Sequence, residues 1–285
     1  MILRTPQFAS NKQDQLHQSL ATSLTMAKPK QKSVKGKKKN ETDPKKVSST
    51  ANKSTAQTEG FPTHLLQSPK KKSPPPQPLD ILVPGAVFAS RNFLTPSECK
   101  AWVCYSEQVG FESLDSPQTY EYAHRKCGRI SRNDWSMSAA LFHRMKGLVQ
   151  QVASQVEVGH YDASYGPVTC NGNLRLYKYD PHMSFGRHYD GSQSIKEYPN
   201  GNTEITVLIY LSSCIGGATR FHLPHSTKKK KRKSEESEVA FVPEQGAILL
   251  HMHGDRCLEH EADPVEEGVK YILRTDIVYA TQKTE

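Results

Sequence analysis

The chain has 285 residues, of which 35% are hydrophobic, and a formal net charge of +9. That length allows one or two domains with a sizeable core, and no run of about 18 apolar residues indicates a membrane span. Residues 1–80 carry 15 Lys and Arg against 5 Asp and Glu, whereas the remaining residues carry 23 against 24. The positive charge therefore belongs to the N-terminal part and says nothing about the folded part.

The N-terminal part, residues 1–78, is rich in Lys, Ser, Thr, Gln and Pro and poor in aromatic residues. Such a segment buries too little apolar surface to offset its chain entropy, so it is predicted to be a disordered basic tail. Its lysine clusters, Lys35–Lys39 and Lys70–Lys72, are typical of nuclear import or of proximity to nucleic acid. They are equally typical of a plain solvated tail, and both interpretations stay open.

The six cysteines are scattered, without a C-x-x-C pair or zinc-like spacing. Together with the lysine-rich tail, they indicate free thiols in a reducing compartment. We therefore expect a soluble intracellular protein, nuclear or cytoplasmic.

Order is expected from about Leu79, so that residues 79–285 form the folded domain. A strand over 84–93 is followed by a helix through about Val109, because Thr95 suits the N-cap, Pro96 the first helical position and Glu98 the other half of a capping box. A second helix is predicted over about 138–156. Its apolar residues recur at helical spacing and indicate one buried stripe.

Beyond residue 161 the pattern changes to strands, predicted at 174–179, 204–211, 218–222, 239–242, 246–252 and 269–279. Two helices followed by many short strands favour an α+β domain whose strands form a sandwich or a barrel. A charged insertion at 226–238 interrupts the series and is expected to be an exposed loop.

The stretch 174–190 carries the first sign of chemistry. It alternates as a strand does, breaks at Asp180-Pro181 and ends in His188-Tyr189-Asp190. Side chains of residues i and i+2 in an extended chain share a face, so His188 and Asp190 can bind the same ion. A non-haem Fe(II) site needs two histidines and one carboxylate, but a lone His-x-Asp is a weak signal.

The last predicted strand places Lys270, Arg274 and Asp276 on one face and aromatic and aliphatic residues on the other. The cations face either water or the interior of a barrel whose outer face the helices cover. Two amphipathic helices are available to cover that face, which favours the second interpretation. Cations in a core are costly unless they are paired with an anion.

From Leu79 onward the chain resembles the prolyl 4-hydroxylase family of 2-oxoglutarate- and Fe(II)-dependent dioxygenases. The segments that carry the resemblance, in order, are LYKYDPHMSFGRHYD, TVLIYLSSCIGGATRF, PEQGAILL and EHEADPVEEGVKYILRTDIVY. The resemblance implies a double-stranded β-helix, or jelly-roll barrel, with the N-terminal helices packed on its major sheet.

The resemblance also implies roles for individual residues. The iron ligands, and so the catalytic centre, would be His188, Asp190 and His260. Lys270 would pair with the distal carboxylate of 2-oxoglutarate, with Arg274 as the second choice. Other residues implied in the co-substrate pocket are Tyr210, Tyr179 and Thr219.

The implied activity is hydroxylation of a C–H bond, by family default in a peptidyl proline, coupled to conversion of 2-oxoglutarate and O2 to succinate and CO2. Ascorbate is the implied reductant. Another protein side chain, a small molecule or a nucleic acid stays open as substrate, with Arg129, Arg132 and Asn133 as candidate substrate-facing residues. A basic nucleic-acid-associated binding module is the non-enzyme alternative.

Several histidines offer a competing metal site. His251 and His253 share a strand face, and His222 and His225 flank the insertion, so a cupin-like site is an alternative. His143 and His182 are predicted to be surface or packing residues.

Overall fold

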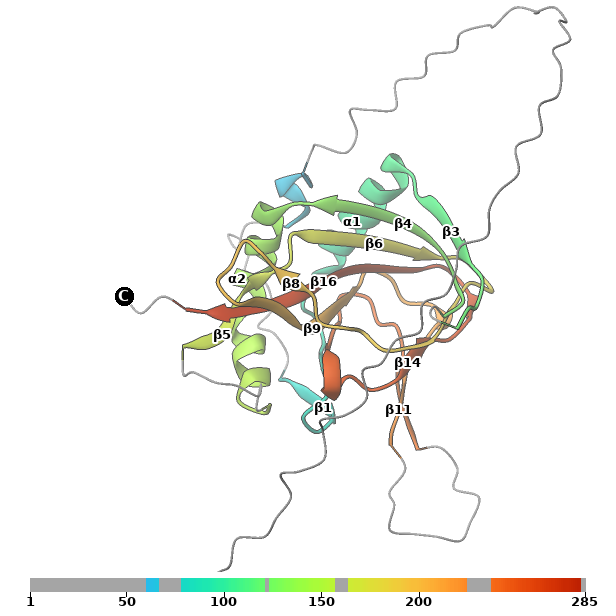
Figure 1. The fold of residues 1–285 in the computed structure, drawn as a ribbon. Coiled ribbons are helices and arrows are strands. Elements are labelled where there is room, and N and C mark those ends of the chain that lie inside the picture. The colour runs from blue at the N-terminus through green and yellow to red at the C-terminus, as the bar shows by residue number, and fades with distance from the viewer. Residues whose placement is uncertain (1–59, 67–77, 121–122, 157–163, 225–236, 283–285) are drawn as a thin grey trace, which may run out of the picture. The chain divides into compact units, whose positions relative to one another are not determined.

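The computed structural model describes residues 60–66, 78–120, 123–156, 164–224 and 237–282. Two helices and a large antiparallel sheet make up most of this part of the chain (Figure 1). The helices are α1 (Pro96–Val109) and α2 (Trp135–Ala153), and two short 3-10 turns are η1 (Thr63–Leu65) and η2 (Gly254–Arg256). None of the described helices is long and apolar enough to span a membrane.

The main sheet contains 14 strands, and a two-stranded sheet accompanies it. The main sheet's strands are β1 (Asp80–Val83), β2 (Val87–Ser90), β3 (Glu112–Ser116), β4 (Arg125–Asn133), β5 (Tyr165–Cys170), β6 (Asn173–Tyr179), β7 (Phe185–His188), β8 (Ser194–Ile195), β9 (Gly201–Tyr210), β11 (Thr219–His222), β12 (Glu238–Phe241), β13 (Ile248–Met252), β14 (His260–Ala262) and β16 (Lys270–Thr281). The smaller sheet pairs β10 (Ile215–Gly216) with β15 (Val265–Glu267).

The main sheet runs in the order β1-β2-β13-β9-β16-β6-β4-β7-β14-β11-β12, with β3 on β4, β5 on β16 and β8 on β9. The strands curl into a nearly closed barrel, which is the double-stranded β-helix predicted from the sequence. Central β16 pairs with both β6 and β9. These three strands therefore give the barrel one wall whose two faces are both buried.

The two faces of that wall hold two different cores. On the outer face, apolar residues of β6, β9 and β16 pack against α1 and α2, as the predicted helix cover requires. On the inner face lie Tyr177, Tyr179, Tyr210 and Ile272. Lys270 is only 1% exposed, so the face of β16 that carries the cations points into the barrel.

The helix N-termini show why these elements begin where they do. Thr95 and Glu98 form the predicted capping box, with the Thr95 amide donating to Glu98 Oε2 at 2.8 Å. The second helix starts at Trp135, three residues earlier than predicted, because Asp134 is its N-cap and accepts from the Met137 amide at 2.8 Å. Arg144 of α2 donates to both carboxylate oxygens of the buried Glu98, which joins the helices.

Three differences from the sequence predictions concern boundaries. The expected strand over 84–93 is limited to β2 (Val87–Ser90), which forms a hairpin with the unpredicted β1. Glu238 belongs to β12 rather than to the charged insertion, because it pairs with His222 in the ladder with β11. Residues 60–66, predicted as part of the tail, instead pack on α1: Phe61 is 5% exposed, and its ring lies 5.2 Å from that of Trp102. The rest of the predicted tail and residues 225–236 fall outside the described residues.

Candidate active site

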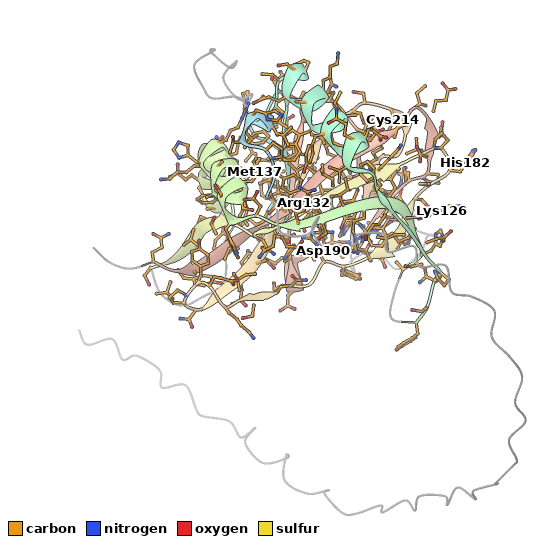
Figure 2. All side chains as sticks on the ribbon, turned by 90° about the horizontal axis from the view of Figure 1, so that it is seen from above. Lys126, Arg132, Met137, His182, Asp190 and Cys214 are labelled. Carbon is orange, nitrogen blue, oxygen red and sulfur yellow. The ribbon has the colours of Figure 1, made fainter. Side chains whose placement is uncertain are left out.

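Three residues that the sequence proposed as iron ligands meet inside the barrel. His188 ends β7, Asp190 follows two residues later, and His260 opens β14, where it pairs directly with His188. The imidazole centroids are 4.2 Å apart. From Asp190, Oδ1 lies 3.9 Å from His188 Nε2, and Oδ2 lies 3.8 Å from His260 Nε2. One donor atom from each residue lies within 4.8 Å of the others. Asp190 is 8% exposed, and Figure 2 labels it near the middle of the described part of the chain.

Backbone contacts orient both imidazoles. His188 Nδ1 lies 2.8 Å from the Gly186 carbonyl, and His260 Nδ1 lies 2.9 Å from the Leu258 carbonyl. Since a carbonyl only accepts, each Nδ1 carries the hydrogen and each Nε2 keeps its lone pair toward Asp190. Burial lowers the pKa of His188 to about 3 and also lowers the pKa of His260. Both rings are therefore neutral near pH 7, as metal ligation requires.

Asp190 is held as a carboxylate by the residues around it. Its Oδ2 accepts from Thr206 Oγ1 at 2.7 Å and from an Arg274 terminal nitrogen at 2.8 Å. Burial alone would raise the pKa of Asp190, but Arg274 and the neighbouring histidines outweigh it and keep that pKa well below its usual value. The site thus contains a permanently ionised oxygen donor.

Arg274 belongs to a buried network of ion pairs. Besides Asp190, it approaches Asp276, with its Nε 3.7 Å from Oδ1. Asp276 in turn accepts from Arg175 at 2.5 Å. Arg274, the second choice for the co-substrate anchor, therefore already has two carboxylate partners.

Lys270 has a different environment. Its Nζ donates to the Gly217 carbonyl at 2.5 Å and lies 5.5 Å and 5.8 Å from the ring centroids of Tyr179 and Tyr210. Within the described part of the chain, no carboxylate comes within ion-pair distance of it. Burial lowers the pKa of Lys270 to about 8. This lysine is a buried cation that lacks an anion.

One cavity connects the lysine with the histidine–aspartate cluster. It holds about 410 Å³ of atom-free space, counted to its open mouth. Its lining includes Tyr179, Thr219 and Lys270 as well as the three proposed iron ligands. Tyr210 does not line it, but its hydroxyl lies 2.7 Å from Thr219 Oγ1. The Gly216-Gly217 turn has φ values of +71° and +64°, the left-handed backbone that the paired glycines predicted.

A second donor set overlaps the first. His251, Cys257 and His260 also place one donor atom each within 4.8 Å of one another. Burial raises the pKa of Cys257 to about 11, so its thiol is protonated at neutral pH and is a poor ligand. The set His188, Asp190 and His260 therefore suits Fe(II) better, since it offers two neutral imidazoles and a carboxylate.

The remaining histidines divide as follows. His251 lines the cavity, 3.6 Å from Asp190 Oδ2, and neither of its ring nitrogens has a hydrogen-bond partner among the described residues. His253 instead binds Thr206 at 2.5 Å. His222 pairs with Glu261 at 2.9 Å, and His225 lies outside the described residues. His143 and His182 are exposed, as predicted.

Sequence reasoning missed two residues of this site. Arg125 lines the cavity with its guanidinium 4.3 Å from the ring centroids of both Tyr177 and Phe185. Thr206 anchors Asp190. The alternation of 204–211 places Thr206 on the inner face, which was a usable signal for it, whereas the interval 110–133 around Arg125 was expected only as loop and short strand. Of the suggested substrate-facing residues, Arg132 points elsewhere, 5.5 Å from the Phe61 ring.

Comparison with known proteins agrees with this geometry. Residues 174–275 match the model of the 2OG-Fe(II) oxygenase superfamily. For that segment, the match agrees with the resemblance to 2-oxoglutarate- and Fe(II)-dependent oxygenases stated from the sequence. No curated protein matches the chain.

Similar solved structures include three prolyl hydroxylases. A viral collagen prolyl hydroxylase from Paramecium bursaria Chlorella virus-1 is 17% identical, with 68% of this chain and 96% of that one covered and a TM-score of 0.44. A Pseudomonas putida prolyl-4-hydroxylase is 14% identical, with 72% and 96% covered and a TM-score of 0.44. A Trichoplax adhaerens prolyl hydroxylase, in complex with a hypoxia inducible factor peptide fragment, is 16% identical, with 69% and 85% covered and a TM-score of 0.45. None of these values is high enough to transfer an activity.

Proposed function

We propose that this oxygenase hydroxylates a C–H bond of a peptidyl proline and converts 2-oxoglutarate and O2 to succinate and CO2. One oxygen atom enters the hydroxyl group and the other enters succinate, so the reaction balances without a further reactant. The observation that supports it is a carboxylate and two correctly oriented imidazoles beside a buried lysine that has no anion. Ascorbate is proposed as the reductant that maintains Fe(II).

In this proposal His188, Asp190 and His260 hold the iron. Three protein ligands leave positions for the co-substrate and O2, and the bound iron would supply the oxidative chemistry. Thr206 and Arg274 hold Asp190 in place, and the Gly186 and Leu258 carbonyls fix the two imidazoles.

Lys270 is proposed as the anchor for the distal carboxylate of 2-oxoglutarate. A buried unpaired cation is costly, and a carboxylate of the co-substrate would compensate it. Tyr179 and Thr219 line the same cavity and would contribute hydroxyl groups, with Tyr210 orienting Thr219. The peptidyl proline is supported by the sequence resemblance alone.

The test measures metal binding and turnover together. Purified protein should bind one Fe(II) and form succinate from 2-oxoglutarate only when Fe(II) is present. The variant His188→Ala should lose both properties. His251→Phe is the control, because it removes an imidazole equally close to His260 but outside the proposed ligand set. Loss of Fe(II) binding in His251→Phe, with binding retained in His188→Ala, would reject the assignment.

A further inference from the structure

A larger pocket opens beside the cavity, and arginine dominates its charge. It holds about 1470 Å³ of atom-free space, counted to its mouth, and includes His188 and Asp190 in its lining. Its charged lining residues are two aspartates, Asp190 and Asp276, and four arginines, Arg125, Arg129, Arg175 and Arg274. Two of the arginines, Arg175 and Arg274, are the partners of those aspartates.

The other two arginines, both on β4, have no such partner. Neither Arg125 nor Arg129 forms an ion pair in the described part of the chain, and the buried Nε of each makes no hydrogen bond there. Glu112 lies opposite Arg129 in the β3–β4 register but is exposed and not paired with it. Among the described residues, the inner wall of the pocket therefore carries two positive charges without a carboxylate partner, and Arg125 lies over the rings of Tyr177 and Phe185.

The spacing of these arginines indicates how long a ligand must be to contact both of them. Residues four apart on a strand share a face and lie about 13 Å apart along it. That separation exceeds the reach of one carboxylate but matches an extended peptide of four or five residues. Arg125 also lines the cavity beside His188, whereas Arg129 lines only the larger pocket. Arg125 is thus the nearer of the two arginines to the proposed iron site, and Arg129 lies farther out in the larger pocket.

We propose that this arginine pair selects peptide substrates in which acidic side chains flank the hydroxylated residue. The inference rests on the proposed function and adds the substrate's charge to it. A guanidinium binds a carboxylate through two parallel hydrogen bonds, so Asp or Glu side chains compensate each arginine with good geometry.

The surroundings favour a peptide over a nucleic acid. Single-stranded nucleic acids need aromatic faces on which bases stack. The Phe185 ring is covered on both sides, by Arg125 at 4.3 Å and by the His188 ring at 3.7 Å. Among the described lining residues, this leaves Tyr189 as the remaining aromatic side chain. The described lining therefore offers four arginines against one exposed tyrosine, Tyr189, which favours an acidic peptide.

The experiment measures peptide binding without turnover. The full chain is loaded with Fe(II) and 2-oxoglutarate under nitrogen. A fluorescein-labelled peptide with a central proline flanked on each side by two glutamates is compared with its glutamine counterpart at 0.15 M salt. The proteins are the parent, Arg129→Gln, Arg129→Lys and the control Arg91→Gln, which removes a half-exposed arginine outside the pocket.

The glutamate peptide should bind the parent and Arg91→Gln at least about tenfold more tightly than the glutamine peptide, a coupling usual for close charge pairs. Arg129→Gln should reduce that preference to about threefold or less, and Arg129→Lys should fall between. Equal binding of the two peptides by the parent would overturn the inference, and this comparison requires no variant. An unchanged preference in a folded Arg129→Gln would also overturn it.

Three further outcomes separate this inference from the alternatives. If a ten-residue oligothymidylate binds more tightly than the glutamate peptide and depends on Arg129, the pocket is a nucleic-acid site and the inference is wrong. If the parent forms succinate with Fe(II) but prefers neither peptide, only this inference fails. If the parent binds no Fe(II) and forms no succinate, the proposed function itself fails.

Discussion

Lys270 and Arg274 lie on the same face of one strand, but Arg274 lies beside carboxylates and Lys270 does not. Arg274 bridges Asp190 and Asp276, whereas Lys270 has only a carbonyl and two aromatic rings around its ammonium group. Removal of one charge should therefore have opposite effects on stability at the two positions.

We expect Arg274→Met to lower the free energy of unfolding by about 3 kcal/mol, because it leaves two buried carboxylates short of a partner. Lys270→Met should leave that free energy unchanged or raise it, because it removes an uncompensated buried charge. Urea denaturation of the two variants without 2-oxoglutarate measures both. A larger loss in Lys270→Met would mean that this lysine has a carboxylate partner in solution.

The pKa of Lys270 gives a second prediction. The charged form binds the anion, and this pKa is lowered to about 8 in the ligand-free protein. Affinity for 2-oxoglutarate should therefore be constant below pH 8 and fall about tenfold per pH unit above it. Titration with Mn(II)-loaded protein at pH 7, 8 and 9 checks the slope. Lys270→Arg, which stays charged, should show a flat profile, and a flat profile in the parent would contradict the assignment.

At the residue scale, the sequence predicted which side chains meet but not how they are paired. The family resemblance brought His188, Asp190, His260 and Lys270 into one site, whereas their spacing alone left the facing of Lys270 open. The bond from Arg274 to Asp190 was not predictable, because it joins β16 to the residues after β7. The unpaired Arg125 also depended on tertiary structure.

Among the elements, α1 is the one whose start the sequence defined best. Glu98 closes the capping box and is also the buried partner of Arg144 on α2. Burial raises its pKa, but hydrogen bonds from Arg144 and Thr95 more than offset this, so its pKa in the folded chain is lowered. One carboxylate thus stabilises both the helix end and the contact between helices.

Glu98→Gln should lower the free energy of unfolding at pH 7 by about 3 kcal/mol, and Thr95→Ala by about 1 kcal/mol. A lowered folded-state pKa stabilises the protein above the unfolded pKa, and that stabilisation is lost as pH falls through the folded pKa. The difference between parent and Glu98→Gln should therefore shrink between pH 5 and pH 3. Exposed Glu112→Gln is the matched control, and an equal effect there would contradict this account.

Three strands, β5, β7 and β14, were not predicted, although the equally short β11 and β12 were. The strands β7 and β14 have four and three residues, so they offer little alternation to detect. His260 was expected in a loop, because only its pairing with β7 and β11 makes it part of a strand.

For the molecule as a whole, the folded part begins earlier than its composition suggested. The Phe61 ring packs near those of Trp102 and Tyr105, and its amide donates to the N-cap of α2, Asp134, at 2.6 Å. Because the residues around Phe61 are mostly polar, composition did not indicate that this one aromatic residue packs against α1.

Phe61→Ala should lower the free energy of unfolding by about 3 kcal/mol, as expected for a buried aromatic residue. A chain that starts at residue 79 should show a similar loss relative to one that starts at residue 60. Thermal unfolding of the three proteins measures both effects. Equal melting temperatures would mean that residues 60–66 do not contribute to the folded unit.

The pairing of β11 with β12 has a practical consequence. His222 and Glu238 face each other in this ladder, and β12 is the last strand in the sheet order. The segment that joins these two strands therefore starts and ends at one pair of neighbouring strand ends, and neither end is a proposed iron ligand. An affinity handle or fluorescent reporter grafted between residues 224 and 237 should leave catalysis intact.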